Sequence, residues 1–250
     1  MSFDPKFYTA LHRGSEGDAD FYRALCKGAS RVLELGCGDA RLLIEIAEVA
    51  SDVVGIEQHP GMLELAARRI KATNVDTVKL IAGDISEPTV DGLFDCILLP
   101  FTTAYCLPQD AFMRCLTACR ELLSADGFIA MDVYPAEIFH DSDISFADFD
   151  ELGEISVDDV VYRVDEQTIV YRDEQRIDVT YRHVPRLGDQ NAVATYTITH
   201  HYLRLSEWRP LLKQAGFGHV EIYGGFDGRA PHEDCDRIII LASQHGASAP

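Results

Sequence analysis

Five short apolar segments alternate with amphipathic stretches over residues 30–133, and this alternation constrains the fold more than any other feature of the chain. The apolar segments read RVLELG, DVVGIE, TVKLIAGD, FDCILLPF and GFIAMDVY. Stretches between them, such as ARLLIEIAEVA, repeat apolar residues at helical spacing. Strands that alternate with helices predict a parallel sheet with right-handed crossovers and helices on both faces. The strands are near-continuous apolar runs, as expected where both faces of a sheet are buried.

The pattern of residue types changes after Tyr134. Over about 151–204, Val, Thr, Tyr and Ile alternate with charged residues, which predicts antiparallel strands joined by a loop at PRLGDQNA. A helix at EWRPLLKQAGF, capped by Ser206 and ended by Gly216, then precedes two last strands, HVEIYG and DRIIILAS. We therefore predict one domain over 1–250 that carries a small antiparallel β insert at about 140–204.

Composition narrows the classes of partner. The 250 residues are 47% hydrophobic, enough for a full core, and 22 basic against 41 acidic residues give a formal charge of −19. Nucleic acid and anionic membranes are disfavoured because no basic patch is visible. The chain has no long apolar run and no signal-peptide pattern, and its seven scattered cysteines suit reduced thiols, so we expect a cytoplasmic protein, monomeric or homodimeric. No metal site is predicted.

Two glycines end the first predicted strand in VLELGCGDARLL. Gly36 and Gly38 let the backbone turn tightly and approach a ligand at the carboxyl edge of the sheet, although an ordinary tight turn would also use them. A dinucleotide site requires G-x-G-x-x-G, and Arg41 stands where the third glycine belongs, so NAD is disfavoured. An acid, Glu34, lies two residues before the first glycine.

This segment resembles the first motif, E/D-x-G-x-G-x-G, of the class I S-adenosylmethionine-dependent methyltransferases. It departs from that motif at Ala40, where a methyl group at the opening of the helix is expected to be tolerated. The resemblance implies a doubly wound, mostly parallel, seven-stranded Rossmann-like sheet whose last strand is antiparallel. It also implies S-adenosylmethionine as cofactor and S-adenosylhomocysteine as product.

The resemblance continues in order along the chain and implies further cofactor-binding residues. Glu57 would accept both ribose hydroxyls, for which the two oxygens of a carboxylate are suited, while a solvated strand end is the alternative. Gln58 and Met62 would flank the adenine, Asp84 would accept a hydrogen bond from its amino group, and Ile85 would offer its backbone. The remaining implied contacts come from the first motif and from the end of the fourth strand: Glu34, Gly36, Cys37, Gly38, Leu99 and Pro100.

The two segments outside the central pattern also resemble parts of small-molecule methyltransferases. FYTALHRGSEGDADFY resembles an N-terminal lid, which gives lid helices over about 1–29, with Tyr8 over the cofactor and Arg13 near its methionine carboxylate. A helix that merely packs is the alternative. The β insert resembles a substrate cover.

Candidates for substrate contact follow the fourth and fifth strands and lie in the insert. Tyr105 and Tyr134 follow those two strands, and in TYTITHHYL the alternation puts only one of two histidines toward a pocket. The face with Tyr196 and Tyr202 suits a core, which favours His201 as a group that handles a proton; both histidines being structural is the alternative. We therefore take His201 and Tyr105 as catalytic candidates, and Tyr105, Tyr134 and His201 as substrate-binding candidates. The loop YGGFDGRAP either borders the pocket or is a plain turn.

The function that these features favour is methyl transfer to a small molecule, with an amine nitrogen as acceptor. An O-methyltransferase and a peptide or protein methyltransferase on the same fold stay open as alternatives. A protein that binds S-adenosylmethionine without catalysis is the alternative of another class.

Overall fold

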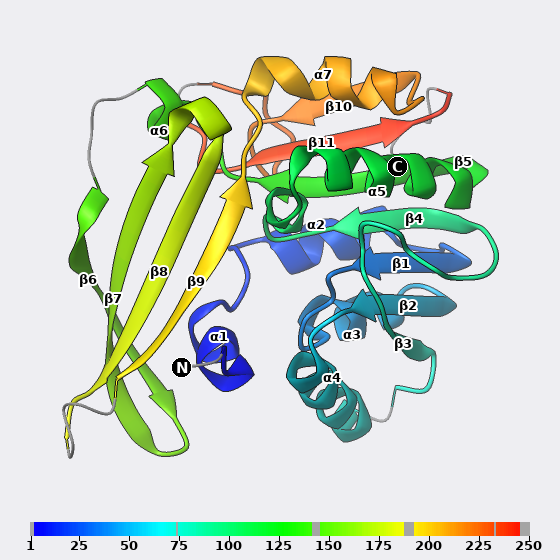
Figure 1. Cartoon of the computed structure of the whole chain (residues 1–250). Helices are drawn as coiled ribbons and strands as arrows, with labels where there is room; N and C mark the ends of the chain where they lie inside the picture. The colour runs from blue at the N-terminus through cyan, green and yellow to red at the C-terminus, as the bar shows by residue number, and fades with distance from the viewer. Residues whose placement is uncertain (1–2, 74, 142–145, 188–192, 233, 246–250) are drawn as a thin grey trace. The chain divides into compact units, whose positions relative to one another are not determined.

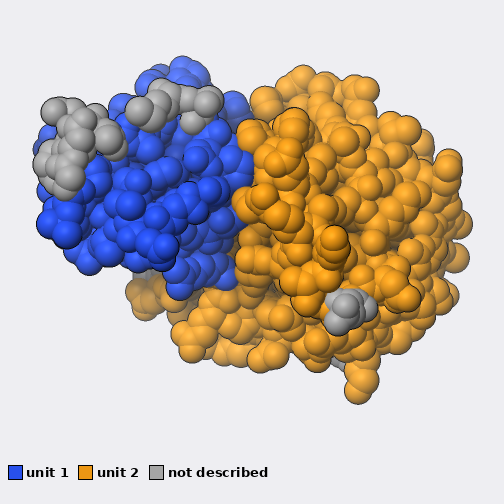
Figure 2. All heavy atoms as spheres, turned by 90° about the horizontal axis from the view of Figure 1, so that it is seen from below, with its two compact units in different colours: residues 1–13, 136–203 blue, residues 14–135, 204–250 orange. Residues whose placement is uncertain are grey.

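The computed structural model describes residues 3–73, 75–141, 146–187, 193–232 and 234–245. The chain forms two compact units, which Figure 2 distinguishes by colour. Unit 1 comprises residues 1–13 and 136–203, and unit 2 comprises residues 14–135 and 204–250. No helix within the described ranges is long and apolar enough to cross a membrane.

Unit 2 is built on a seven-stranded sheet in the order β10-β11-β5-β4-β1-β2-β3 (Figure 1). Neighbouring strands are parallel except for β11, which pairs antiparallel with both β5 and β10. The predicted sheet with an antiparallel last strand is confirmed. The strands are β1 Arg31–Leu35, β2 Asp52–Glu57, β3 Val78–Ala82, β4 Phe94–Leu99, β5 Leu123–Val133, β10 His219–Tyr223 and β11 Ile238–Ser243.

Helices cover both faces of this sheet. On one face, α2 (Asp18–Leu25), α3 (Arg41–Ala47) and α4 (Pro60–Thr73) share one apolar cluster with alternate residues of β1, β4, β5 and β11. Figure 1 shows α5 (Gln109–Leu122) and α7 (Leu205–Gln214) in front of the sheet. Burial of this kind contributes about 1.5–3 kcal/mol for each large apolar side chain, which is why each amphipathic helix packs its apolar face on the sheet.

The start of α7 differs from the prediction. Ser206 was predicted to cap this helix, but the helix begins at Leu205, after Arg204, and Ser206 lies in its first turn. The physical reason is the Glu207 carboxylate, which accepts a hydrogen bond from the backbone N–H of Arg204 at 2.7 Å and so closes the turn one residue earlier. Gly216, with φ of 93°, follows the helix end as predicted.

Unit 1 contains a four-stranded antiparallel sheet in the order β6-β7-β8-β9, which confirms the predicted β insert. The helix α1 (Pro5–Leu11) packs through Phe7 into an apolar cluster with Val164, Tyr181 and Tyr196. Part of the predicted loop PRLGDQNA, residues 188–192, lies outside the described residues. The other elements of the unit are α6 Glu137–Asp141, β6 Phe146–Val157, β7 Val160–Tyr171, the short 3-10 helix η2 Arg172–Glu174, β8 Arg176–Pro185 and β9 Ala194–His201.

The strand order of unit 2 fixes where a ligand can bind. The chain runs outward from β1 to β2 and β3, then returns to β4 on the other side of β1. At such a reversal the connections at the carboxyl ends of two adjacent strands diverge and leave a crevice. The residues that follow β1 and β4 therefore border the candidate site.

Candidate functional site

The turn after β1 brings the backbone close to other side chains. Gly36 and Gly38 have φ of 72° and 56°, and the N–H of Gly36 donates to the Ile56 carbonyl at 2.8 Å. A Cβ at Gly36 would lie 2.8 Å from Thr103 Cγ2, and one at Gly38 would lie 3.2 Å from Met62 Cε. Gly36 is thus required by conformation and by space, whereas Gly38 is required by conformation, because the Met62 methyl group ends a flexible side chain and can yield.

Ala40 stands where the family motif has its third glycine, and its backbone shows why glycine is usual there. Ala40 is buried and has φ of 64°, directly before α3 begins at Arg41. An L-residue in this left-handed region costs about 1–2 kcal/mol, and glycine avoids that cost. The expectation that this position opens the helix is confirmed, and the alanine is strained there because its Cβ crowds the following carbonyl in left-handed backbone.

The Glu57 carboxylate is fixed at the carboxyl end of β2. Its Oε2 accepts a hydrogen bond from the N–H of Gly38 at 3.1 Å, and its Oε1 accepts one from the N–H of His59 at 2.7 Å. A carboxylate has about four lone-pair positions, so each oxygen can still accept a bond from a ligand hydroxyl. The geometry thus ties the acid of β2 directly to the glycine turn of β1.

Glu34 places a second acid beneath this turn. Its side chain is 3% exposed, and Oε2 has no hydrogen-bond partner among the described residues. Burial raises the pKa of this carboxyl well above its usual value, which favours the protonated form. Burial also raises the pKa of the neighbouring Cys37 thiol, so that Cys37 stays a neutral packing group. The orphaned oxygen of Glu34 is a polar atom that a ligand could satisfy.

The predicted adenine contacts follow β2 and β3. Gly83, which precedes Asp84, donates its N–H to the Glu57 carbonyl at 3.1 Å, so Asp84 leaves β3 beside the end of β2. Asp84 is exposed, and its Oδ1 accepts the N–H of Ser86 at 2.8 Å, with Ile85 half-buried between them. Gln58 is exposed, whereas Met62 is buried against Gly38. Their predicted roles toward the cofactor stay predictions.

The end of β4 supplies a buried wall. Leu99 and Pro100 are buried, and Thr103 Oγ1 donates to the Pro100 carbonyl at 2.6 Å. Tyr105 lies in the short 3-10 helix η1 (Thr103–Cys106) and is 1% exposed. Its hydroxyl donates to the Tyr134 carbonyl at 3.2 Å, and its ring packs on those of Tyr134 and Trp208. These contacts suit a packing residue, and a substrate role for Tyr105 or Tyr134 stays a prediction.

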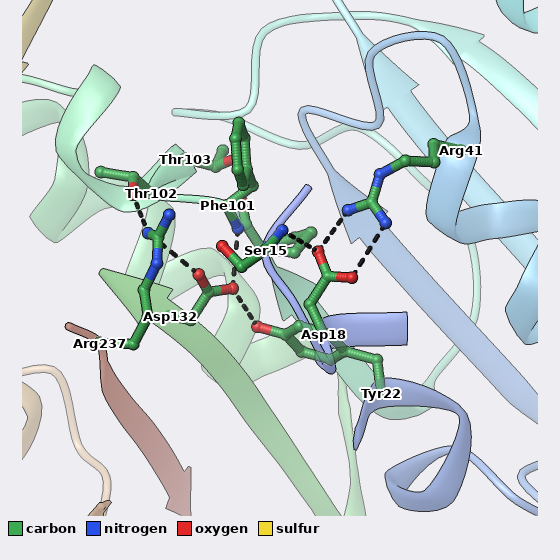
Figure 3. Close-up of polar contacts among 10 residues, drawn as sticks. Ser15, Asp18, Tyr22, Arg41, Phe101, Thr102, Thr103, Asp132 and Arg237 are labelled. Carbon is green, nitrogen blue, oxygen red and sulfur yellow. Dashed lines mark hydrogen bonds and ion pairs between the residues drawn. The ribbon is translucent and has the colours of Figure 1, made fainter. Parts of the chain in front are cut away.

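Two buried polar pairs at this edge were not predicted from the sequence (Figure 3). The first joins Asp18, 4% exposed at the start of α2, to both terminal nitrogens of Arg41 at 2.6 and 3.0 Å. It fastens α2 to the residue that follows the glycine turn. Ser15 adds a backbone N–H to the same carboxylate at 3.0 Å.

The second pair joins Asp132, near the end of β5, to Arg237, just before β11. Asp132 is 1% exposed, and its Oδ1 accepts the N–H of Phe101 at 2.8 Å and the hydroxyl of Tyr22 at 2.7 Å. Burial raises the pKa of Asp132, while Arg237 opposes that shift. An acid inside the apolar run IAMDV was the available signal in the sequence, because a buried carboxylate needs several polar partners.

Unit 1 holds the remaining predicted residues. Tyr8 lies on α1 with its ring 4.4 Å from that of His12, and Arg13 Nε donates to the Ala10 carbonyl at 3.0 Å. His201 ends β9, half-buried, and pairs with Arg176 in the strand register. The predicted alternation along β9 holds, since Tyr196 and Ile198 share the cluster that includes α1. The roles of Tyr8, Arg13 and His201 toward cofactor and substrate stay predictions.

His12 is a buried titratable group that sequence reasoning missed. Its Nε2 lies 3.2 Å from the Tyr196 hydroxyl, and its ring lies 5.0 Å from that of Tyr181. Burial, together with His200 and His183, lowers the pKa of His12 to about 4. Burial also lowers the pKa of His183. At neutral pH His12 and His183 are uncharged, which is the form that an apolar environment favours.

We expect the stability of unit 1 to fall with acidification because of His12. Its folded pKa is below the unfolded value, so the neutral side chain has no effect at pH 7. Protonation then favours unfolding as the pH drops from 6.5 toward 4. Between pH 6.5 and pH 4, the free energy of unfolding should decrease by about 1–3 kcal/mol more in the wild type than in His12→Gln. Urea titrations at several pH values test this, with exposed His232→Gln as the control; equal pH dependence in wild type and His12→Gln would contradict it.

Unit 2 also has an open hollow between the start of α2 and the connection from β10 to β11. Phe21 and Phe226 lie in its lining with ring centroids 5.4 Å apart. The acids Glu16, Asp20, Asp234 and Asp236 line the hollow, as do Arg229, paired with Asp227, and Arg237. The glycine-rich loop YGGFDGRAP therefore borders a hollow, and the lining is net acidic.

Comparison with known proteins finds a methyltransferase domain in part of the chain. Residues 32–127 match the family model of the methyltransferase domain. A protein of Geobacillus sp. (strain WCH70) that carries a methyltransferase name is 25% identical over 225 residues, which cover 87% of this chain and 86% of the relative.

Solved structures share the fold across almost the whole chain. An S-adenosylmethionine-dependent methyltransferase from Clostridium acetobutylicum superposes with a TM-score of 0.79 at 16% identity and covers 96% of this chain and 97% of its own. The sugar N-methyltransferase KedS8 from Streptoalloteichus sp. superposes with a TM-score of 0.72 at 15% identity and covers 96% of this chain and 91% of its own. At these identities the likeness concerns the fold. Residues 32–127 therefore match a methyltransferase domain, and the chain as a whole has the fold of the S-adenosylmethionine-dependent methyltransferases.

Proposed function

We propose that the carboxyl edge of β1, β2 and β4 holds S-adenosylmethionine and that the chain transfers its methyl group to a small amine. The observation that carries the binding proposal is the bond from Gly38 to Glu57, which unites the glycine turn with the ribose-binding acid of the family motif. The orphaned Glu34 oxygen and the cradle at Gly36, which a Cβ would fill, are the features that fit a bound nucleoside.

Each residue in this proposal has a limited task. The sulfonium of the cofactor supplies an activated methyl group, so the protein does not have to create the reactive group. Glu57 holds the sugar, Asp84 and Met62 hold the base, and Leu99 and Pro100 form the wall beside the methionine part. Fixed geometry of this kind lowers the barrier by restricting the approach of the nucleophile, which contributes up to about 7–11 kcal/mol in intramolecular reactions.

An amine is the acceptor that the charges favour. The hollow at α2 carries more acidic than basic side chains, and a site of that sign raises the local concentration of cationic ligands. The fold match to the sugar N-methyltransferase KedS8 extends over 96% of the chain, and so includes the antiparallel sheet as well as the cofactor domain. Transfer to nitrogen requires the neutral amine, so the acceptor must lose a proton first. His201 is the candidate to accept it, because the Tyr105 hydroxyl is buried and donates to the Tyr134 carbonyl.

A methyl-transfer assay with three acceptor classes tests the proposal. Amino sugars and amino acids are offered as amines, together with simple phenols and carboxylic acids, each with S-adenosylmethionine at saturation. We expect S-adenosylhomocysteine to form with amines and not with the oxygen acceptors. Turnover with phenols or carboxylates alone would contradict nitrogen as the acceptor. Saturable cofactor binding without turnover of any acceptor would favour the non-catalytic alternative.

A further inference from the structure

The turn after β4 is strained in a way that the cofactor motifs do not explain. Phe101 and Thr102 have φ of 53° and 67°, so two consecutive residues with side chains adopt left-handed backbone. Each costs about 1–2 kcal/mol, and such strain persists only where the surroundings enforce it. Thr102 is 6% exposed, so its surroundings are protein.

Four hydrogen bonds and an ion pair enforce this conformation (Figure 3). The N–H of Phe101 donates to Asp132 Oδ1 at 2.8 Å, and the N–H of Thr102 donates to the Asp132 carbonyl at 2.9 Å. Tyr22 donates its hydroxyl to the same Oδ1, at 2.7 Å. Arg237 donates to Thr102 Oγ1 at 2.8 Å and lies 3.4 Å from Asp132 Oδ2. The carboxylate and the guanidinium thus hold the turn by backbone and side chain at once.

The strained turn contacts the glycine turn of β1. Thr103 follows Thr102 directly, and its Cγ2 lies only 2.8 Å from the position of a Cβ at Gly36. The Thr103 hydroxyl donates to the Pro100 carbonyl at 2.6 Å, and this bond fixes the side-chain rotamer, so the methyl group keeps its place as long as the turn does. Any relaxation of Phe101 and Thr102 therefore changes the wall of the cofactor site.

We propose that Asp132 and Arg237 are positioning residues for methyl transfer. They hold the Phe101–Thr102 turn so that Thr103 and Pro100 keep their places beside Gly36. This inference rests on the proposed function, because it assigns the glycine turn to the cofactor. Neither residue is catalytic in this scheme, because each acts through the turn.

The test compares Arg237→Met with Arg31→Met. Arg31 is an ion-paired, partly buried arginine of similar exposure, but it pairs with Asp52 at the opposite, amino end of the sheet. With S-adenosylmethionine and the amine acceptor both saturating, we expect Arg237→Met to lower kcat about tenfold or more, because a small misplacement of the reacting groups has an effect of that size. Arg31→Met should change kcat less than about twofold. Arg237→Lys, which keeps the charge, should recover part of the loss.

Two further measurements separate positioning from stability. Amide exchange at residues 101–103 should quicken in Arg237→Met and not in Arg31→Met. In a Thr102→Gly background, where neither the hydroxyl nor the backbone strain of residue 102 remains, Arg237→Met should reduce kcat by a smaller factor than in the wild type. The inference would be overturned if Arg237→Met lowered the melting temperature but left kcat and amide exchange as in the wild type. It would also be overturned if Arg237→Met reduced kcat by the same factor in the wild-type and Thr102→Gly backgrounds. Failure of the wild type to bind S-adenosylmethionine would overturn the proposed function instead, and amide exchange would still show whether Arg237 holds the Phe101–Thr102 turn.

Discussion

Gly36→Ala is expected to weaken binding of S-adenosylmethionine by about 10–100-fold, which corresponds to about 1.4–2.8 kcal/mol. The new Cβ would lie 2.8 Å from Thr103 Cγ2, a distance that forces the turn after β4 to move. Overpacking of this kind costs about 1–3 kcal/mol, and the positive φ of 72° adds backbone strain. Calorimetric titration of the folded variant with the cofactor measures the effect.

Gly28→Ala is the matched control for this substitution. Gly28 has a similar φ of 80°, but a Cβ there meets nothing within 4 Å. It therefore reproduces the backbone strain without the contact, and cofactor affinity should stay within about twofold. Thr103→Ser in the Gly36→Ala background removes the clashing methyl group and keeps the hydroxyl that bonds to Pro100, so it should restore affinity. Equal affinities in Gly36→Ala and Gly28→Ala would contradict the role of this contact.

Glu57→Ala is expected to weaken cofactor binding by about 1.5–3 kcal/mol, through the loss of hydrogen bonds to a charged acceptor. The substitution also frees the N–H groups of Gly38 and His59, which the carboxylate now holds at 3.1 and 2.7 Å. The affinity of S-adenosylhomocysteine should fall by the same factor, because the ribose is common to both nucleosides. Competition binding with either nucleoside measures this.

Glu64→Ala removes an exposed glutamate from α4, close in sequence, and serves as the control. It should leave both affinities unchanged within about twofold, since an exposed side chain without buried contacts contributes little. An unchanged affinity in Glu57→Ala would remove the ribose role from this acid.

Local patterns in the sequence located the central sheet and its glycine turn. Near-continuous apolar runs mark strands buried on both faces, and the runs at DVVGIE and FDCILLPF coincide with β2 and β4. The turn at Gly36 was predictable because glycine has a specific conformational role there. The resemblance to a family supplied the antiparallel last strand, which periodicity alone does not indicate.

The parts that were missed depend on contacts between distant segments. Thr103 meets Gly36 across 67 residues, and Arg237 meets Thr102 across 135 residues, so neither pair leaves a local pattern. The left-handed backbone at Phe101 and Thr102 is imposed by Asp132, against the preference of both residues. The predicted cap at Ser206 was wrong although the contact that decides it is local. Serine has the higher capping preference, but the hydrogen bond from the Arg204 N–H to Glu207 starts the helix one residue earlier.

Titration of the full chain with S-adenosylmethionine in a calorimeter tests the central claim most directly. A site at the ends of β1 and β2 predicts saturable heat and competition by S-adenosylhomocysteine, with both lost or strongly reduced in Glu57→Ala. Absence of saturable heat with either nucleoside, in protein whose folding is verified by its cooperative unfolding, would contradict it.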